Sequence, residues 1–373
     1  MDSAAPAAVP GFVDHHAHLL RTAAGVPFPA STAAVREFHH RVAAEGSTPM
    51  DVLDPPLESP ALGEVLRAAL GQAARCGLVE VTEMGMRSWA YLEALGAAQE
   101  AGPLPARVRV FLASGLAGEA SLDELDARRA GCGPWIRLDG VKFYADGWLG
   151  PRTCALCGNF ADTADNGLLF TDASRLARRI VPLACRGWRV ATHAIGDRAA
   201  QTVLDAYEQA WDGDRTAIAA ARPRIEHASV LSGDLIARMA DLGVIACIQP
   251  SFAVTDAALL GPALGPDRSA RAYPYTAMAA AGVPMLAGSD YPIEVLDPVV
   301  GLARLTAGRS ARAGFRTAQA APAQAVLPVA AAFALMTDPA AGQTLLSADP
   351  RTAGAAIDEI EVTGTAPAPF WPE

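Results

Sequence analysis

The sequence predicts an α/β protein, and more specifically a (β/α)8 TIM barrel, from three observations. Short apolar segments rich in β-branched residues alternate with helical patterns along most of the chain, which is typical of parallel βαβ units. Every gap between these segments is long enough for a crossover connection. Histidine, lysine and aspartate residues follow several of them, as catalytic residues do at the mouth of such a barrel. The expected strands are residues 12–16, 78–82, 107–112, 138–143, 188–193, 224–227, 244–248 and 284–287.

Helical patterns fill most of the gaps between these strands. Three further segments are too long to be plain connections, namely 19–59, 144–172 and 249–274. Each follows a strand on the side of the mouth, so the three segments are candidates for the walls or lid of a substrate site. The expected helices are residues 60–76, 88–101, 121–130, 173–186, 197–212, 232–242, 275–282 and 297–306.

Length and composition indicate one globular domain. The 373 residues exceed the roughly 250 of a typical barrel, and 51% hydrophobic with 19% charged residues is far from disorder. We expect the barrel to occupy residues 1–340. Residues 341–373 then form a C-terminal tail with one short strand near 357–362.

Charge and hydropathy restrict the partners. The formal net charge of −10 argues against nucleic acid and anionic membrane, because both attract a positive face. No leader-like start and no run of about 18 apolar residues is found. The expectation is a cytoplasmic protein that acts on a small molecule, with a homodimer as a further expectation.

The six cysteines do not form a disulfide framework in a chain of this length. Cys154 and Cys157 have CxxC spacing, which fits a redox pair or half of a zinc site. No second CxxC follows, so a structural zinc would lack its other ligands. We therefore favour a packing role in the loop for this pair.

His16 and His18 form a His-x-His pair at the end of the first expected strand. Because side chains alternate along a strand, both imidazoles share a face and could hold one metal ion, while His15 points the other way. Taken alone, the pair could equally be two histidines in a polar loop.

Lys142 stands in an otherwise apolar run, GVKFYA, where a free ammonium is costly to bury. A desolvated lysine has a lowered pKa and becomes nucleophilic. Its amine could take up carbon dioxide as a carbamate, whose two oxygens can bridge two metal ions. A salt bridge to Asp146 or Asp290 is the alternative, and the residues alone do not separate the two.

His193, His227 and Asp290 also follow apolar strands. Either histidine alone would be read as a core residue, and Asp290 alone as a helix N-cap. Together with the His-x-His pair they indicate a metal site, in which Asp290 can bind a metal and accept a proton from water. Metal coordination lowers the pKa of water from about 15.7 toward about 7.

The assembled motifs resemble the amidohydrolase superfamily, in particular the family-3 branch that includes N-substituted formamide deformylases. The resemblance extends from residue 10 to about 300. It is carried by PGFVDHHAHL, GVKFYADGWLGPRT, NGLLF, VATHAIGDRAAQTVLDAYE, RIEHASVLS, QPSF and AGSDYP.

The resemblance implies a barrel with two divalent metal ions, usually zinc. By position, His16 and His18 bind the more buried metal and His193 and His227 the other. Carbamylated Lys142 bridges the two metals. Asp290 binds the buried metal and acts as the general base.

The chain also departs from the family pattern. Only nine residues precede Pro10, and the tail lacks the usual Gly-x-x-Ala-Asp run. The accessory β-sandwich of the family is therefore expected to be absent or strongly reduced. Trp148 stands where relatives commonly have serine, which predicts a narrower or more aromatic pocket.

The predicted function is hydrolysis of an amide, formamide or cyclic amide C–N bond, with Asp290 as the catalytic residue. The same site could serve deamination, ester or lactone opening, or a non-hydrolytic step on a biosynthetic intermediate; a non-catalytic barrel is the third hypothesis. Arg152 could hold a substrate carboxylate or an oxyanion, or brace its loop through an ion pair. The other candidate substrate contacts are Trp148, Glu83 and Tyr291.

Overall fold

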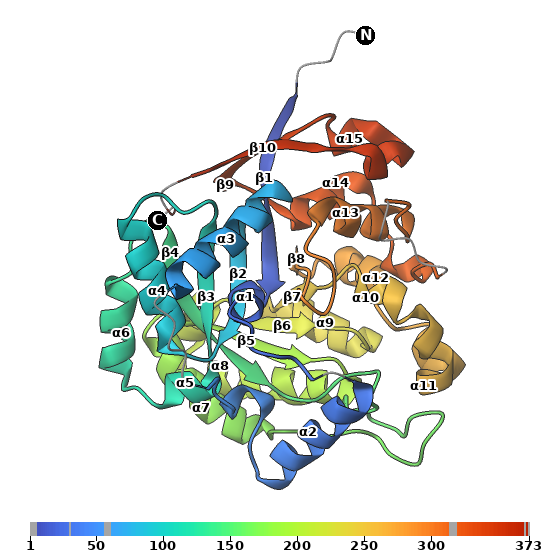
Figure 1. The fold of residues 1–373 in the computed structure, drawn as a ribbon. Helices are drawn as coiled ribbons and strands as arrows, with labels where there is room; N and C mark the ends of the chain where they lie inside the picture. Colours follow the sequence, from blue (N-terminus) through green and yellow to red (C-terminus); the bar gives the residue numbers. More distant parts are fainter. Residues whose placement is uncertain (1–5, 30, 56–60, 313–318, 369–370, 372–373) are drawn as a thin grey trace.

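The computed structural model describes residues 6–29, 31–55, 61–312, 319–368 and 371. Their strands form one ten-stranded sheet with the order β10-β9-β1-β2-β3-β4-β5-β6-β7-β8 (Figure 1). From β1 to β8 all neighbours are parallel, and each of the eight expected strands is present. They are β1 (Ala7–Ala17), β2 (Leu78–Met86), β3 (Arg107–Ala113), β4 (Ile136–Tyr144), β5 (Arg189–Ala194), β6 (Arg224–His227), β7 (Ile245–Ile248) and β8 (Met285–Ala287).

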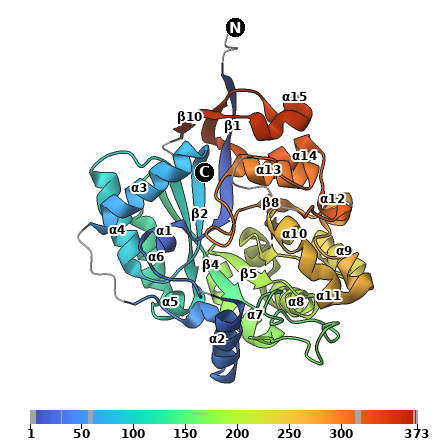
Figure 2. The same ribbon diagram turned by 45° about the vertical axis from the view of Figure 1, so that its right-hand side comes forward.

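The expected helices connect these strands, and most begin at a capping residue. Ser121 and Glu124 form a capping box, and the Asp172 and Asp297 side chains accept backbone N–H groups of the helices they precede. In the view of Figure 2, α3 and α4 lie on one side of the strands and α9, α11 and α12 on the other. These connecting helices are α3 (Leu62–Arg75), α4 (Trp89–Glu100), α6 (Leu122–Ala130), α7 (Ala173–Cys185), α8 (Asp197–Ala220), α9 (Gly233–Leu242), α12 (Tyr275–Ala280) and α13 (Pro298–Ala307).

Two of the three long segments contain helices of their own. Segment 19–59 holds α1 (Leu19–Ala23), α2 (Thr32–Ala44) and the 3-10 helix η1 (Pro49–Asp51). Segment 249–274 holds α10 (Phe252–Thr255) and α11 (Ala257–Ser269). Shorter elements are α5 (Ser114–Gly118), the 3-10 helix η2 (Ala323–Ala325) and α14 (Val329–Leu335). No helix in the described ranges is both long and apolar enough to cross a membrane.

The two ends of the parallel series lie next to each other. The backbone N–H of Asp290, just after β8, donates to the carbonyl of His16 in β1 at 2.7 Å, and His18 N–H donates to Tyr291 O at 2.7 Å. A Cβ atom at Gly288 would lie 2.4 Å from His16 N. Glycine is therefore required where the chain leaves β8 and passes over β1.

The C-terminal segment extends the same sheet. β9 (Thr337–Leu346) pairs antiparallel with β1, and β10 (Val362–Pro367) pairs antiparallel with β9. The expected boundary at residue 340 thus falls inside β9.

The strand expected near 357–362 is wrong in position. The 3-10 helix η3 (Gly354–Glu359) follows α15 (Pro350–Ala353) there, and β10 begins only at Val362. Ile357 and Ile360 are both buried. Their spacing of three places them on one face of a 3-10 turn, where alternation in a strand would separate them.

Candidate metal centre

The parallel strands bring all six expected ligand residues to one end of the sheet. His16 lies in β1 and His18 directly after it, Lys142 in β4, His193 in β5 and His227 at the end of β6, while Asp290 follows β8. In the register of the sheet, Lys142 pairs with Ala191 and His227 with Ala194. The carboxyl ends of parallel strands share an edge, so residues far apart in sequence meet there.

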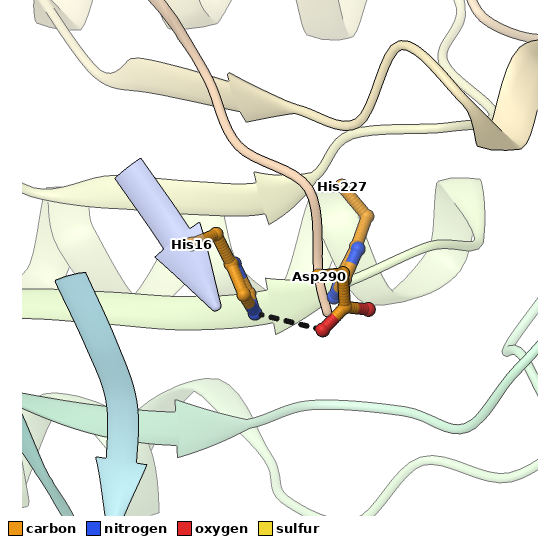
Figure 3. Close-up of side chains that lie close together, drawn as sticks. All are labelled: His16, His227 and Asp290. Carbon is orange, nitrogen blue, oxygen red and sulfur yellow. Dashed lines mark ion pairs between the residues drawn. The ribbon is translucent and has the colours of Figure 1, made fainter. Parts of the chain in front are cut away.

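His16, His227 and Asp290 lie close together (Figure 3). One ligand atom from each lies within 4.8 Å of the others, and all three residues are buried. Asp290 Oδ1 lies 3.4 Å from Nε2 of His16 and 3.2 Å from Nε2 of His18. The carboxylate is therefore close to both members of the His-x-His pair.

The ring orientations are set by contacts behind the imidazoles. Nδ1 of His16 donates to Glu226 Oε2 at 2.6 Å, and Nδ1 of His227 donates to Gln249 Oε1 at 2.7 Å. Arg224 Nε donates to the other Glu226 oxygen at 2.7 Å. Metal-binding histidines commonly donate their second N–H in this way, which leaves Nε2 as the ligand atom.

His227 reaches the centre through an unusual backbone conformation. Glu226 and His227 are neighbours in β6, so regular alternation would place their side chains on opposite faces. His227 has a φ of 75°, and Ala228 after it has 48°. The left-handed turn directs both side chains toward the same centre, and Asp290 is also left-handed, with a φ of 59°.

Lys142 and His193 each carry a buried polar atom without a hydrogen-bond partner in the described part of the chain. Lys142 is 1% exposed, and its Nζ has no partner. Asp146, one of its expected salt-bridge partners, instead accepts the backbone N–H groups of Ala155, Ile195 and Gly196. His193 donates from Nε2 to Gly147 O at 3.0 Å, which leaves Nδ1 unpaired.

Unpaired buried polar groups cost about 1–3 kcal/mol each. A metal ion would give His193 Nδ1 a partner, and conversion of the Lys142 amine to a carbamate would replace the unpaired amine by an anionic group that can bind metal through its oxygens. The residues present therefore fit a metal group.

Burial keeps the imidazoles neutral. It lowers the pKa of His18 to about 4 and of His227 to about 3, and it lowers the pKa of His16 and His193 as well. Burial by itself raises the pKa of Asp290, but the neighbouring His16 and His18 lower it by more than that, and the resulting pKa is about 2. At neutral pH the centre thus offers unprotonated nitrogens and an ionised carboxylate, the states that bind metal.

Two cavities meet at this centre. One of about 300 Å³ is lined by His18, Tyr144 and Asp290, and the other, of about 360 Å³, by His193, His227 and Asp290. Trp148 lines both cavities, as expected for a substrate contact.

The other three candidate substrate contacts are not among the lining residues of these two cavities. Arg152 pairs with Asp162 at 2.7 Å and also donates to carbonyls of its own loop, which matches the loop-bracing interpretation. Glu83 is buried and accepts the N–H groups of Leu20 and Arg21. Tyr291 packs against the hydrophobic core.

Several residues near the centre were not predicted from the sequence. Glu226 and Gln249 orient histidines; both stand in motifs that carry the family resemblance, RIEHASVLS and QPSF, but no role was assigned to them. Arg21, Arg87 and His39 line the first cavity. The CxxC pair is present as free thiols, with Cys154 buried and Cys157 exposed.

Two curated proteins are similar to part of this chain. YtcJ of Bacillus subtilis (strain 168) is 34% identical over 171 residues, which cover 46% of this chain and 31% of YtcJ. LONG AFTER FAR-RED 3 of Arabidopsis thaliana is 33% identical over 169 residues, 44% of this chain and 28% of that protein. The matched regions are therefore less than a third of each relative.

A solved metal-dependent hydrolase of uncharacterised function from Pyrococcus furiosus has a similar fold. Its TM-score is 0.65 at 20% identity, over 96% of this chain and 85% of that one. Residues 36–348 match the amidohydrolase family and include Lys142, His193, His227 and Asp290. The chain therefore belongs to the amidohydrolase family.

Proposed function

We propose that this protein is a metal-dependent hydrolase that cleaves the C–N bond of an amide, formamide or cyclic amide in a small molecule. The observation that carries the proposal is the buried amine of Lys142. It lies without a hydrogen-bond partner in the described residues, at the strand end where four neutral imidazoles and Asp290 gather.

The proposed ligand set contains His16, His18, His193, His227, Asp290 and Lys142. Two divalent cations, with zinc preferred, are held by these residues. Burial lowers the pKa of Lys142 to about 8, against the opposing charges of Glu226 and Asp290. The free amine can therefore add to carbon dioxide, forming the N–C bond of a carbamate and releasing one proton.

The bound metal ions would supply Lewis acidity and lower the pKa of water. In this proposal the carboxylate of Asp290 accepts the proton of the attacking water. The same carboxylate then delivers it to the leaving nitrogen as the C–N bond breaks. Trp148 and the surrounding apolar walls exclude bulk water from the reacting groups.

We also infer that the eight parallel strands close into a barrel. The hydrogen bonds between His16 and Asp290 and between His18 and Tyr291 support closure at the mouth. The accessory sandwich of the family is then reduced to β9 and β10.

The lysine content of the chain allows a specific test of the carbamate. Lys142 is the single lysine among its 30 lysine and arginine residues. Incubation with ¹³C-labelled bicarbonate should therefore give one lysine carbamate resonance in the ¹³C spectrum. The Lys142→Ala variant should lack that resonance and lose its zinc, and short carboxylic acids should restore zinc binding.

Turnover is tested with a panel of formamides, amides, amines and lactones. Release of formate or another carboxylate together with an amine supports the proposal. Ammonia release from amines alone would favour deamination, and full turnover by Asp290→Asn would contradict the assigned base.

A further inference from the structure

The cavity of about 300 Å³ carries two arginines on one side of the metal centre, and we call this part, around Arg21 and Arg87, the cationic lobe. His18 and Asp290 line the same cavity. A molecule bound there can touch the lobe and the centre together.

Arg21 has its charge matched. Its Nε donates to Asp54 Oδ1 at 2.8 Å, and its guanidinium lies 4.7 Å from the centre of the Phe28 ring. Asp54 also accepts the hydroxyl of Tyr91 at 3.0 Å. Asp54 is therefore already occupied, and the nearby carboxyl group of Glu83 accepts the backbone N–H groups of Leu20 and Arg21.

Arg87 is not matched. Its one side-chain hydrogen bond in the described part of the chain runs from Nη1 to Val52 O at 3.3 Å. It forms no ion pair there, although the charge of Asp54 acts on it from a greater distance. Burial and the neighbouring Arg21 lower the pKa of Arg87 to about 10. By contrast, Arg152 has both an acid and two carbonyls as partners.

Apart from His39 and Tyr144, the remaining side chains of the lobe are mostly apolar. Phe28, Phe38, Val35 and Met50 line it, and Trp148 closes it toward the second cavity. A single uncompensated guanidinium offers a planar fork that suits a carboxylate. The two oxygens of a carboxylate match this fork, whereas the third oxygen of a phosphate would need a separate donor such as Tyr144.

We infer that the cationic lobe binds the carboxylate of an amphipathic substrate through Arg87, while Phe28, Phe38 and Trp148 contact its apolar part. This inference rests on the proposed function, because it makes the substrate an amide that also carries a free acid, such as an N-acyl amino acid with an apolar side chain. The scissile amide then lies beside Asp290, and the acid lies in the lobe.

Binding of matched probes to the metal-loaded protein tests the inference. 3-Phenylpropanoate should bind at least about tenfold more tightly than 3-phenylpropanamide, because a charge-assisted pair replaces a neutral contact. Arg87→Gln should abolish this preference. Arg178→Gln, which changes an exposed arginine on α7, should keep it. A preference for the acid that survives in Arg87→Gln, as direct binding to the metal would produce, overturns the inference.

Arg87→Lys provides a second variant if the glutamine variant fails to fold. It keeps the charge but loses the fork, so the preference should fall by several-fold without vanishing. An unchanged preference in this variant would contradict a bidentate contact at Arg87.

Turnover separates failure of the inference from failure of the proposed function. N-formylphenylalanine and its carboxamide analogue are compared as substrates. The wild-type kcat/KM should be higher for the acid, and in Arg87→Gln the two kcat/KM values should be equal. Equal turnover of both substrates by the wild type would overturn the inference about Arg87 but would still support the proposed hydrolase function. Arg87-dependent binding without any turnover would support the lobe and count against the proposed reaction.

Discussion

Individual contacts decide which nitrogen of each imidazole faces the centre. Glu226 and Gln249 take the Nδ1 protons of His16 and His227, and Gly147 O takes the Nε2 proton of His193. His193 therefore presents Nδ1 where the other two rings present Nε2. The sequence indicated the histidines, but the choice of nitrogen depends on partners that come from other strands and loops.

Gln249→Leu should weaken metal binding at His227 by about 10- to 100-fold, because the ring loses the acceptor that holds it in place. The change keeps the size and charge of the side chain nearly constant. Competition with a fluorescent chelator measures the effect. Gln201→Leu, at an exposed position on α8, is the matched control, and equal retention of metal by both variants would contradict the role of Gln249.

Asp256 gives a pH-dependent prediction. Burial raises its pKa to about 6 although Tyr273 donates a hydrogen bond to it at 2.5 Å. The folded state thus holds this proton more tightly than the unfolded chain, so stability is lost as the pH rises from about 4 through 6. Asp256→Asn removes the titration and keeps an oxygen for Tyr273.

The free energy of unfolding of Asp256→Asn minus that of wild type should therefore increase by about 1 kcal/mol or more between pH 4 and pH 7. Urea denaturation with a chelator present at both pH values measures it without a contribution from bound metal. Asp267→Asn, at an exposed position, should show no such increase. A difference that decreases as the pH rises would contradict the raised pKa of Asp256.

Among the elements, α2 lines the cavity beside the candidate metal centre. It is held there through the buried side chain of His39. His39 Nδ1 and Thr153 Oγ1 are 2.8 Å apart, and the His39 ring packs edge-on against Trp148 and Phe170. This joins two of the long segments that the sequence assigned to the mouth. The helix itself was not predicted, because its polar residues give a weak periodic signal.

His39→Ala should loosen α2 while the strands stay protected. We expect amide hydrogen exchange within residues 32–44 to accelerate by an amount equivalent to about 1–3 kcal/mol. His40→Ala, at the exposed neighbouring position, should leave the exchange rates unchanged. Uniform acceleration across the sheet would instead indicate global destabilisation.

At the level of the whole molecule, β9 and β10 attach the C-terminal segment to the edge of the sheet. The buried hydroxyl of Thr344 accepts the N–H of Phe12 at 3.0 Å and donates to Gly77 O at 2.8 Å. One side chain therefore ties β9, β1 and the turn before β2 together.

Thr344→Val should lower the free energy of unfolding by about 1–3 kcal/mol, because two buried backbone groups lose their partner while the volume is kept. Thermal and urea denaturation measure the change. Thr363→Val, at an exposed position of β10, is the control. A loss of equal size in both variants would mean that the hydroxyl of Thr344 does not join these segments.

The positions of the strands could be derived from the sequence because a strand buried among helices needs a continuous apolar run, and turns must separate such runs. The candidate ligand residues could be proposed for a related reason, since burying His, Lys or Asp at the end of a strand is costly unless the side chain is paired or binds a ligand. The left-handed turn at His227, the second contacts of Glu226 and Gln249, and the unmatched guanidinium of Arg87 required the folded structure. Each depends on groups brought together from distant parts of the chain, and a local sequence pattern does not show how close two residues far apart in sequence lie in the folded protein.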